Sequence, residues 1–132
     1  MKRRTFLAFA ATTSVLPHTA FAAGFVDYTP GLIQSELAAG KTVFVDYSAV
    51  WCSTCARQER VINALRGQNA AYDKAMKFIK VDWDEYGNHD VARSRAIPRR
   101  STLILLRGDQ ELGRIVAGTA QDQIQELMDR GL

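Results

Sequence analysis

Residues 43–55 read VFVDYSAVWCSTC, an apolar run that leads into two cysteines separated by two residues. The first half of this stretch is rich in β-branched and aromatic side chains, which predicts a buried strand over residues 41–48. Cys52 and Cys55 then open a predicted helix that runs to about Arg66. The sequence therefore places two thiols at a strand-to-helix junction.

The two cysteines are the only ones in the chain. Unpaired N–H groups and the positive end of the helix dipole stabilise a thiolate at a helix N-terminus. We expect Cys52, at the exposed start of the helix, to be the attacking thiol. Cys55 lies one turn further in, and we expect it to be the resolving thiol that breaks a mixed disulfide.

Other uses of a cysteine pair fit this sequence less well. A bridge between residues only three apart constrains little of the unfolded chain, which argues against a purely structural disulfide. A zinc site needs two further ligands, and beyond residue 22 the chain offers one histidine, His89. Covalent haem attachment needs histidine at position 56, where Ala56 stands. Binding of Cu(I) by the thiolates of Cys52 and Cys55 stays open as an alternative. If the pair instead exchanges disulfides, no cofactor is expected.

Composition limits the function further. With 132 residues, 47% of them hydrophobic, the chain is expected to form one small domain. Its formal charge of +3 comes from three basic residues within positions 1–22, because the whole chain has 17 basic and 14 acidic residues and 17 − 3 leaves 14 against 14. We therefore expect no attraction for nucleic acid. No apolar stretch after the N-terminus is long enough to span a membrane.

Residues 1–22 have the features of a signal peptide. A basic start is followed by a short apolar stretch, and Ala20-Phe21-Ala22 places small residues where a signal peptidase cleaves. The run Arg3-Arg4-Thr5-Phe6-Leu7 resembles the twin-arginine export signal. An ordinary secretory signal and an uncleaved anchor are the alternatives. We expect a periplasmic domain over residues 23–132, in a compartment where thiols can be oxidised.

The mature chain is predicted to follow the order α-β-α-β-α-β-β-α. Its expected helices lie near residues 30–40, 52–66, 89–95 and 120–130, and its strands near 41–48, 77–82, 102–106 and 111–116. Asn69 could cap a further short turn, residues 84–88 read as a polar connection, and Gly108-Asp109 suits a tight hairpin. This order predicts an α/β fold with a central mixed sheet of about four strands flanked by helices, ending in a β-hairpin and a helix.

Over residues 25–132 the chain resembles the thioredoxin superfamily. Thioredoxins carry a buried aspartate six residues before the first cysteine, as in Val45-Asp46-Tyr47 here, and a tryptophan directly before that cysteine, as Trp51. The segment Lys80-Val81-Asp82 is similar to the strand whose lysine lies near the buried acid. The resemblance implies a thioredoxin-like fold and an enzyme that acts as a thiol:disulfide oxidoreductase.

The resemblance also implies supporting roles around the pair. A carboxylate at Asp46, its pKa raised by burial, would take the proton of Cys55, and Lys80 would moderate that pKa. Glu59 lies four residues after Cys55, as in the carboxy-terminal periplasmic domain of the electron transporter DsbD, which this sequence resembles most. The alternatives are an Asp46 hydrogen-bonded to backbone, a solvated Lys80 and a plain exposed Glu59.

The sequence departs from the family pattern in two places. Ser53-Thr54 replaces the Gly-Pro pair between the cysteines of thioredoxin. At the loop that carries a cis-proline in the family, an ungapped alignment places Ser101, followed by Thr102, whereas Pro98 is the alternative. A cis bond before serine costs about 3–4 kcal/mol, so we expect the bond between Arg100 and Ser101 to be trans.

These observations predict an exported thiol:disulfide oxidoreductase, with reduction as the expected direction. Its expected partners are disulfide-containing envelope proteins and a thiol electron donor, including a membrane electron transporter, and a monomer is expected. Arg57, Arg60, Arg99 and Arg100 would form a basic rim that favours acidic partners. The alternatives are a disulfide oxidase or isomerase of the same fold, and a Cu(I) metallochaperone that uses Cys52 and Cys55.

Overall fold

The computed structural model describes residues 24–132. The predicted signal peptide and its cleavage site lie outside the described residues. Within the described part, no helix combines the length and the apolar character needed to cross a membrane.

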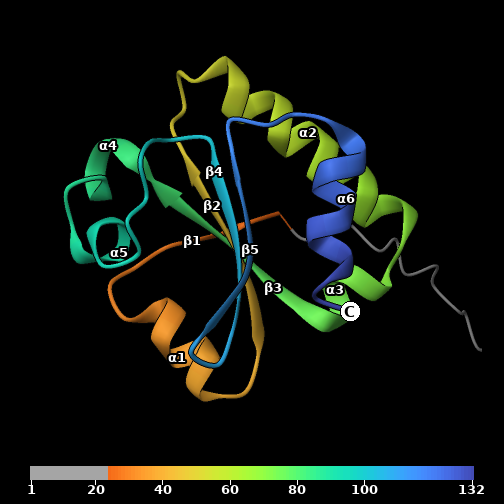
Figure 1. Cartoon of the computed structure of the whole chain (residues 1–132), viewed down its shortest axis with the longest axis horizontal. Helices are drawn as coiled ribbons and strands as arrows, with labels where there is room; N and C mark the ends of the chain where they lie inside the picture. The colour runs from red at the N-terminus through yellow and green to blue at the C-terminus, as the bar shows by residue number, and fades with distance from the viewer. Residues whose placement is uncertain (1–23) are drawn as a thin grey trace, which may run out of the picture.

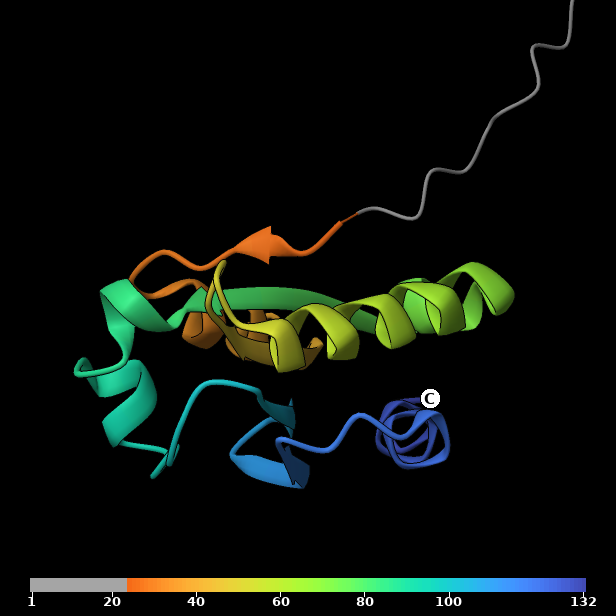
Figure 2. The same cartoon turned by 90° about the horizontal axis from the view of Figure 1, so that it is seen from above.

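A mixed sheet forms the centre of the fold, as the sequence predicts. Over residues 24–132 it has five strands in the order β1-β3-β2-β4-β5 (Figures 1 and 2), with bounds Val26–Asp27 (β1), Thr42–Ser48 (β2), Met76–Asp82 (β3), Thr102–Arg107 (β4) and Gln110–Val116 (β5). Strand β3 pairs in parallel with β1 and β2, whereas β4 is antiparallel to β2 and β5. The prediction of about four strands missed β1, because two exposed residues are too short to show a periodicity.

Helices cover both faces of this sheet (Figure 1). The helices α1, α4 and α5 lie on one face, with bounds Leu32–Ala38, Trp83–Tyr86 and Asp90–Arg93. The helices α2, α3 and α6 lie on the other face, with bounds Ser53–Gln68, Ala71–Ala75 and Gln121–Asp129. The fold is therefore α/β, with a mixed sheet between two helical layers, as the sequence predicts.

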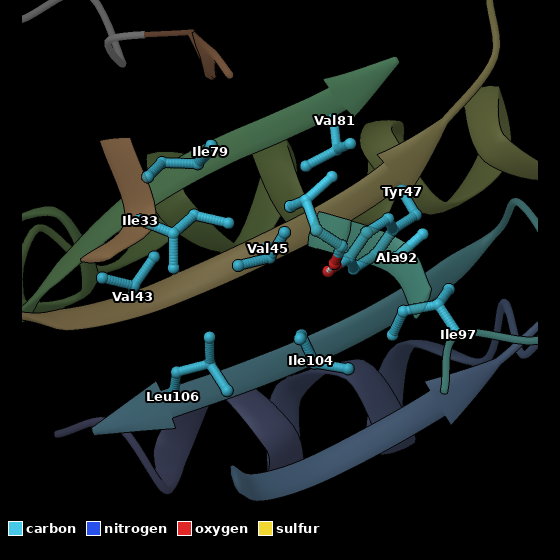
Figure 3. Packing of buried hydrophobic residues seen from close by; sticks show 11 residues of the cluster. Ile33, Val43, Val45, Tyr47, Ile79, Val81, Ala92, Ile97, Ile104 and Leu106 are labelled. Atoms are coloured by element: carbon cyan, nitrogen blue, oxygen red, sulfur yellow. Dashed lines mark hydrogen bonds between the residues drawn. The ribbon is translucent and has the colours of Figure 1, made fainter. Parts of the chain in front are cut away.

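Alternation along β2 divides the buried side chains between two cores. Val43, Val45 and Tyr47 belong to the core beneath α1 and α5 (Figure 3), and Phe44 belongs to the core beneath α2, α3 and α6. Successive side chains of a strand point to opposite faces of the sheet. Asp46 therefore points toward the face that α2 covers, together with Phe44.

Several predicted boundaries differ from those observed. Helix α1 begins after Gly31, which has a φ of 88°, rather than at Thr29-Pro30. Helix α2 continues through Gly67 to Gln68, because the buried residues of its last turns hold it against the sheet core at the small cost of one glycine. The segment predicted as a polar connection over 84–88 contributes most of α4.

Candidate active site

Cys52 caps the N-terminus of α2, as the sequence predicts. Its backbone is extended, its N–H donates to the carbonyl oxygen of Ala49 at 3.1 Å, and its Sγ accepts the N–H of Cys55 at 3.2 Å. The two cysteines form a disulfide with their Cα atoms 5.2 Å apart. An N–H group in the first turn of α2 therefore faces the sulfur that is expected to carry negative charge.

The expected exposure of Cys52 is wrong for this disulfide state. Its exposed fraction is 5%, against 1% for Cys55, and both cysteines pack with Ala49 and the half-buried ring of Trp83. The sequence could not show that Trp83, 31 residues further on, folds back over the pair. Cys52 nevertheless lines a pocket of about 510 Å³, so that its edge faces an open space.

Ser101 lies directly beside both sulfurs. Its Oγ is 3.2 Å from Sγ of Cys52 and 3.0 Å from Sγ of Cys55, and the residue is fully buried. No cis peptide bond occurs within residues 24–132, so the Arg100–Ser101 bond is trans, as expected. Pro98, the alternative for this position, is exposed. The hydroxyl of the next residue, Thr102, turns away to donate to the carbonyl oxygen of Arg99 at 2.7 Å.

Gln58 is a site residue that sequence reasoning missed. Its side chain is fully buried, and its Nε2 donates to the carbonyl oxygens of Ser101 and Gly118, both at 2.9 Å. Its position three residues after Cys55, on the same face of α2, was the available signal. This glutamine ties the redox helix to the loop that carries Ser101.

Asp46 is fully buried, and neither of its carboxylate oxygens has a hydrogen-bond partner within the described residues. The alternative of an aspartate bonded to backbone is therefore wrong. Burial raises the pKa of Asp46 to about 7, the charge of Lys80 lowers it, and the charge of Glu59 raises it. A carboxyl group with such a pKa can accept and return a proton near neutral pH.

Lys80 and Glu59 form an ion pair near this carboxyl. Lys80 stands opposite Asp46 in the parallel β2–β3 register, and its Nζ lies 2.7 Å from Oε1 of Glu59. Both side chains are about one-third exposed. Neither the solvated lysine nor the plain exposed glutamate describes these paired, partly buried side chains. The two charges act on the pKa of Asp46 in opposite directions.

Trp51 is 58% exposed and is held at its edge and at its face. Its Nε1 donates to the carboxylate of Asp84, at 3.1 Å from Oδ1 and 2.9 Å from Oδ2. The guanidinium carbon of Arg100 lies 4.3 Å from the ring centroid. This contact brings one predicted rim arginine directly beside the redox pair.

Charge around the site is divided. Arg57 and Arg60 are exposed on α2, and Arg99 and Arg100 are half-buried on the loop before β4. The pocket that borders Cys52 has the opposite character, since the described residues that line it include four acidic residues and one lysine: Asp27, Glu59, Asp82, Glu85 and Lys80. The predicted basic rim therefore covers only part of the surroundings.

The described residues offer no metal site beside the cysteine pair. His89 is an exposed residue at the N-terminus of α5, with its ring against Tyr86. Within residues 24–132 there is no group of three or more histidine, cysteine or acidic side chains that could hold a metal ion.

A family model and individual relatives match most of this chain. The sequence model of the family described as Thioredoxin matches residues 27–130. The chain is 35% identical over 89 residues to thioredoxin H2-1 of Oryza sativa subsp. japonica, a match that covers 67% of this chain and spans only 59% of that relative's length. It is 32% identical over 88 residues to thioredoxin-1 of Saccharomyces cerevisiae, covering 67% of this chain and 80% of the relative.

The fold matches solved structures as well. The crystal structure of Trxlp from Edwardsiella tarda aligns with a TM-score of 0.66 and 29% sequence identity, covering 76% of this chain and 96% of that one. Thioredoxin NaTrxh from Nicotiana alata aligns with a TM-score of 0.62 and 27% identity, covering 77% and 87%. Since the family model matches residues 27–130, which is most of the chain, and Cys52 caps α2 with Cys55 in its first turn, this protein belongs to the thioredoxin family.

Proposed function

We propose that this protein is a thiol:disulfide oxidoreductase that reduces disulfides in envelope proteins after export. The observation that carries this proposal is the placement of Cys52 at the N-cap of α2, where its sulfur accepts the N–H of Cys55. Family membership supports the same chemistry. The pocket beside Cys52 offers a route by which a substrate disulfide reaches the sulfur.

The reaction starts from the reduced pair. The thiolate of Cys52 attacks one sulfur of the substrate disulfide, forms a mixed disulfide and releases the other substrate sulfur as a thiolate, which takes a proton from solvent. Cys55 then loses its proton and attacks Sγ of Cys52, which breaks the bond to the remaining substrate sulfur. Two electrons pass to the substrate, and the enzyme is left with the disulfide seen in the structure.

Asp46 is proposed as the base for the second step. It points to the face of the sheet that α2 covers, and its carboxylate has no hydrogen-bond partner within the described residues. Its pKa of about 7 lets it take the Cys55 proton at neutral pH and release it afterwards.

A reductase similar to the carboxy-terminal domain of DsbD is the proposed subtype. The ion pair between Glu59 and Lys80 supports it, because Glu59 acts on the pKa of Asp46 from one turn beyond Cys55. The relatives named above are thioredoxins, so the subtype rests on these residues. Such a reductase, which we propose to be a monomer, must be reduced again by a thiol electron donor after each reaction. We propose that a membrane electron transporter is this donor, because an oxidising envelope requires imported electrons.

Trapping tests the reductase proposal. A Cys55→Ala variant produced in the envelope retains Cys52 in mixed disulfides, which non-reducing electrophoresis and mass spectrometry identify. Cys52→Ala is the matched control, because it keeps one cysteine but removes the attacking sulfur. Adducts with disulfide-containing envelope proteins in the first variant alone are expected. The absence of adducts in both variants would contradict a disulfide-exchange role.

Localisation is tested separately. Mass spectrometry of protein from the periplasmic fraction is expected to give a mature N-terminus at Ala23. Replacing Arg3 and Arg4 together with lysine is expected to retain the protein in the cytoplasm, because a twin-arginine signal requires the arginine pair. Unimpaired export of this double variant would point to the ordinary secretory route, and a periplasm without the protein would contradict export.

A further inference from the structure

The hydroxyl of Ser101 is placed to bond either sulfur of the redox pair. Its Oγ lies 3.2 Å from Sγ of Cys52 and 3.0 Å from Sγ of Cys55, in a fully buried position. A serine hydroxyl has one proton to donate and two lone pairs that accept. It can therefore donate to one sulfur while it accepts an S–H proton from the other.

The backbone holds this hydroxyl in place. The N–H of Ser101 donates to the carbonyl oxygen of Tyr47 at 2.7 Å, and its own carbonyl oxygen accepts the N–H of Ala117 at 2.8 Å and Nε2 of Gln58 at 2.9 Å. Its φ of 63° lies in the left-handed region that residues with side chains avoid. Three hydrogen bonds thus fix a strained backbone so that Oγ faces both sulfurs.

We propose that Ser101 is a catalytic residue whose hydroxyl donates a hydrogen bond to the thiolate of the reduced cysteine pair. The proposal rests on the proposed function, because it adds a residue to the same reaction. In the reduced protein the hydroxyl donates to the Cys52 thiolate and accepts the S–H of Cys55. Hydrogen bonds to an ionised acceptor are stronger than those to a neutral one, so this bond favours the anionic form of Cys52.

The same hydroxyl serves the second step. Once Cys52 is bound in the mixed disulfide its sulfur is neutral, and the anion forms at Cys55 after its proton has gone to Asp46. The hydroxyl of Ser101 then turns to donate to Cys55. The electron pair of the Cys55 thiolate forms the new bond to Sγ of Cys52, and the substrate sulfur leaves with the pair from the broken bond.

A donor that favours the thiolate also affects the redox equilibrium. Stabilising the reduced state of a dithiol makes the pair a stronger oxidant. Loss of the Ser101 hydroxyl should therefore shift the pair toward the disulfide in a glutathione buffer. This readout needs no substrate protein.

Two variants remove the hydroxyl in different ways. Ser101→Ala removes the hydroxyl but disfavours a positive φ as serine does, whereas glycine adopts a positive φ without strain. Ser101→Gly therefore carries the test if the alanine variant does not fold. Ser94→Ala, which removes an exposed hydroxyl at the end of α5, is the matched control. The measurement is the rate at which iodoacetamide alkylates Cys52 in the reduced protein across a pH series.

The expected result is a fall of about tenfold in the alkylation rate at pH 7 in both Ser101 variants, with the pH profile moved to higher pH, because a hydrogen bond to a charged group contributes about that factor. The equilibrium constant with glutathione is expected to move toward the disulfide by a similar factor. Ser94→Ala should match the unaltered protein in both measurements.

Unchanged rates in both Ser101 variants would overturn the proposal, and so would a loss in alanine that glycine restores, since glycine also lacks the hydroxyl and its normal rate would show that the hydroxyl is dispensable. Failure of the proposed function is distinguishable from either outcome. It would appear as a Cys55→Ala variant that forms no mixed disulfides with envelope proteins, while the alkylation rate of Cys52 still depends on Ser101.

Discussion

Lys80 stands opposite Asp46 in the β2–β3 register, yet its ammonium group bonds to Glu59 at 2.7 Å, and the Asp46 carboxylate has no hydrogen-bond partner within the described residues. One cation therefore acts on two carboxylates. Burial raises the pKa of Asp46 to about 7, and the smaller effects of Lys80 and Glu59 oppose each other. The ion pair therefore leaves the pKa of Asp46 close to neutral pH, where a base can both take and return a proton.

Glu59→Gln is expected to lower the pKa of Asp46. The change removes a negative charge that raises this pKa and frees Lys80 to interact with Asp46. The pH–rate profile for disulfide reduction should therefore move to lower pH. Single-turnover reduction of a fluorescent peptide disulfide, followed from pH 5 to pH 9, measures this shift.

Glu126→Gln is the matched control for Glu59→Gln, because it removes an exposed helix glutamate that also pairs with a basic residue. Its profile should stay in place. Lys80→Gln should move the profile to higher pH, since the charge of Lys80 lowers the pKa of Asp46. A shift of the Glu59 and Lys80 variants in the same direction would contradict the assignment of Asp46 as the base.

Asp46→Asn is expected to stabilise the protein at neutral pH while it slows resolution. The folded state holds the Asp46 proton more tightly than the unfolded state, so this group's contribution to stability is fully present below about pH 4 and is lost as the pH rises to about 7. The pKa of Asp46 rises from 3.8 to about 7, and this rise corresponds to roughly 4 kcal/mol at most in the free energy of unfolding. Urea unfolding of the oxidised protein at pH 4 and pH 8 measures this difference.

The asparagine variant should show a smaller fall in unfolding free energy between the two pH values than the unaltered protein. Asp109→Asn, in the exposed hairpin turn, is the control and should keep the fall. An equal fall in Asp46→Asn would mean that another group titrates in this range. Mixed disulfides on Cys52 should also persist longer in the Asp46 variant, because the base for Cys55 is gone.

The fold and the redox pair could be predicted from local patterns. The buried strand before Cys52 and the helix that Cys52 caps follow from residue type and spacing along one stretch of chain. The position of Ser101 followed from its strand register, since Thr102 begins β4 as the alignment required. These features depend on neighbours in sequence, which a single sequence displays.

The features that the sequence did not predict depend on contacts between distant segments. The burial of Cys52 needs Trp83, and the role of Gln58 needs the carbonyl groups of Ser101 and Gly118. The acidic pocket beside Cys52 gathers residues from β1, α2, β3 and α4. No periodicity or local motif encodes these long-range contacts, because they follow from how the helices and strands pack.

Gln58→Ala is expected to cost about 1–3 kcal/mol in the free energy of unfolding. It leaves the carbonyl oxygens of Ser101 and Gly118 without their side-chain donor and opens a cavity beneath α2. Gln68→Ala, at the exposed end of the same helix, should change stability by no more than about 0.5 kcal/mol. Chemical denaturation of both variants in the oxidised state measures the difference, and equal stabilities would show that Gln58 does not hold the Ser101 loop.

Arg100→Gln is expected to weaken reduction of acidic substrates selectively. Arg100 lies over the exposed ring of Trp51, beside the redox pair, so its charge acts where a partner peptide approaches Cys52. Removing it should lower kcat/KM a few-fold for a peptide disulfide flanked by glutamates, because an ion pair at the protein surface contributes about 0.2–1 kcal/mol. For a peptide disulfide flanked by lysines, kcat/KM of Arg100→Gln should equal or exceed that of the unaltered protein.

Salt and a second arginine variant separate charge from packing. The preference of the unaltered protein for the acidic peptide should shrink as ionic strength rises, and Arg100→Gln should already lack most of that salt dependence. Arg93→Gln, an exposed arginine on α5, should retain it. An equal loss on both peptides would instead mean that Arg100 acts by holding the Trp51 ring. That outcome would leave the selection of partners to the four acidic residues of the pocket that borders Cys52.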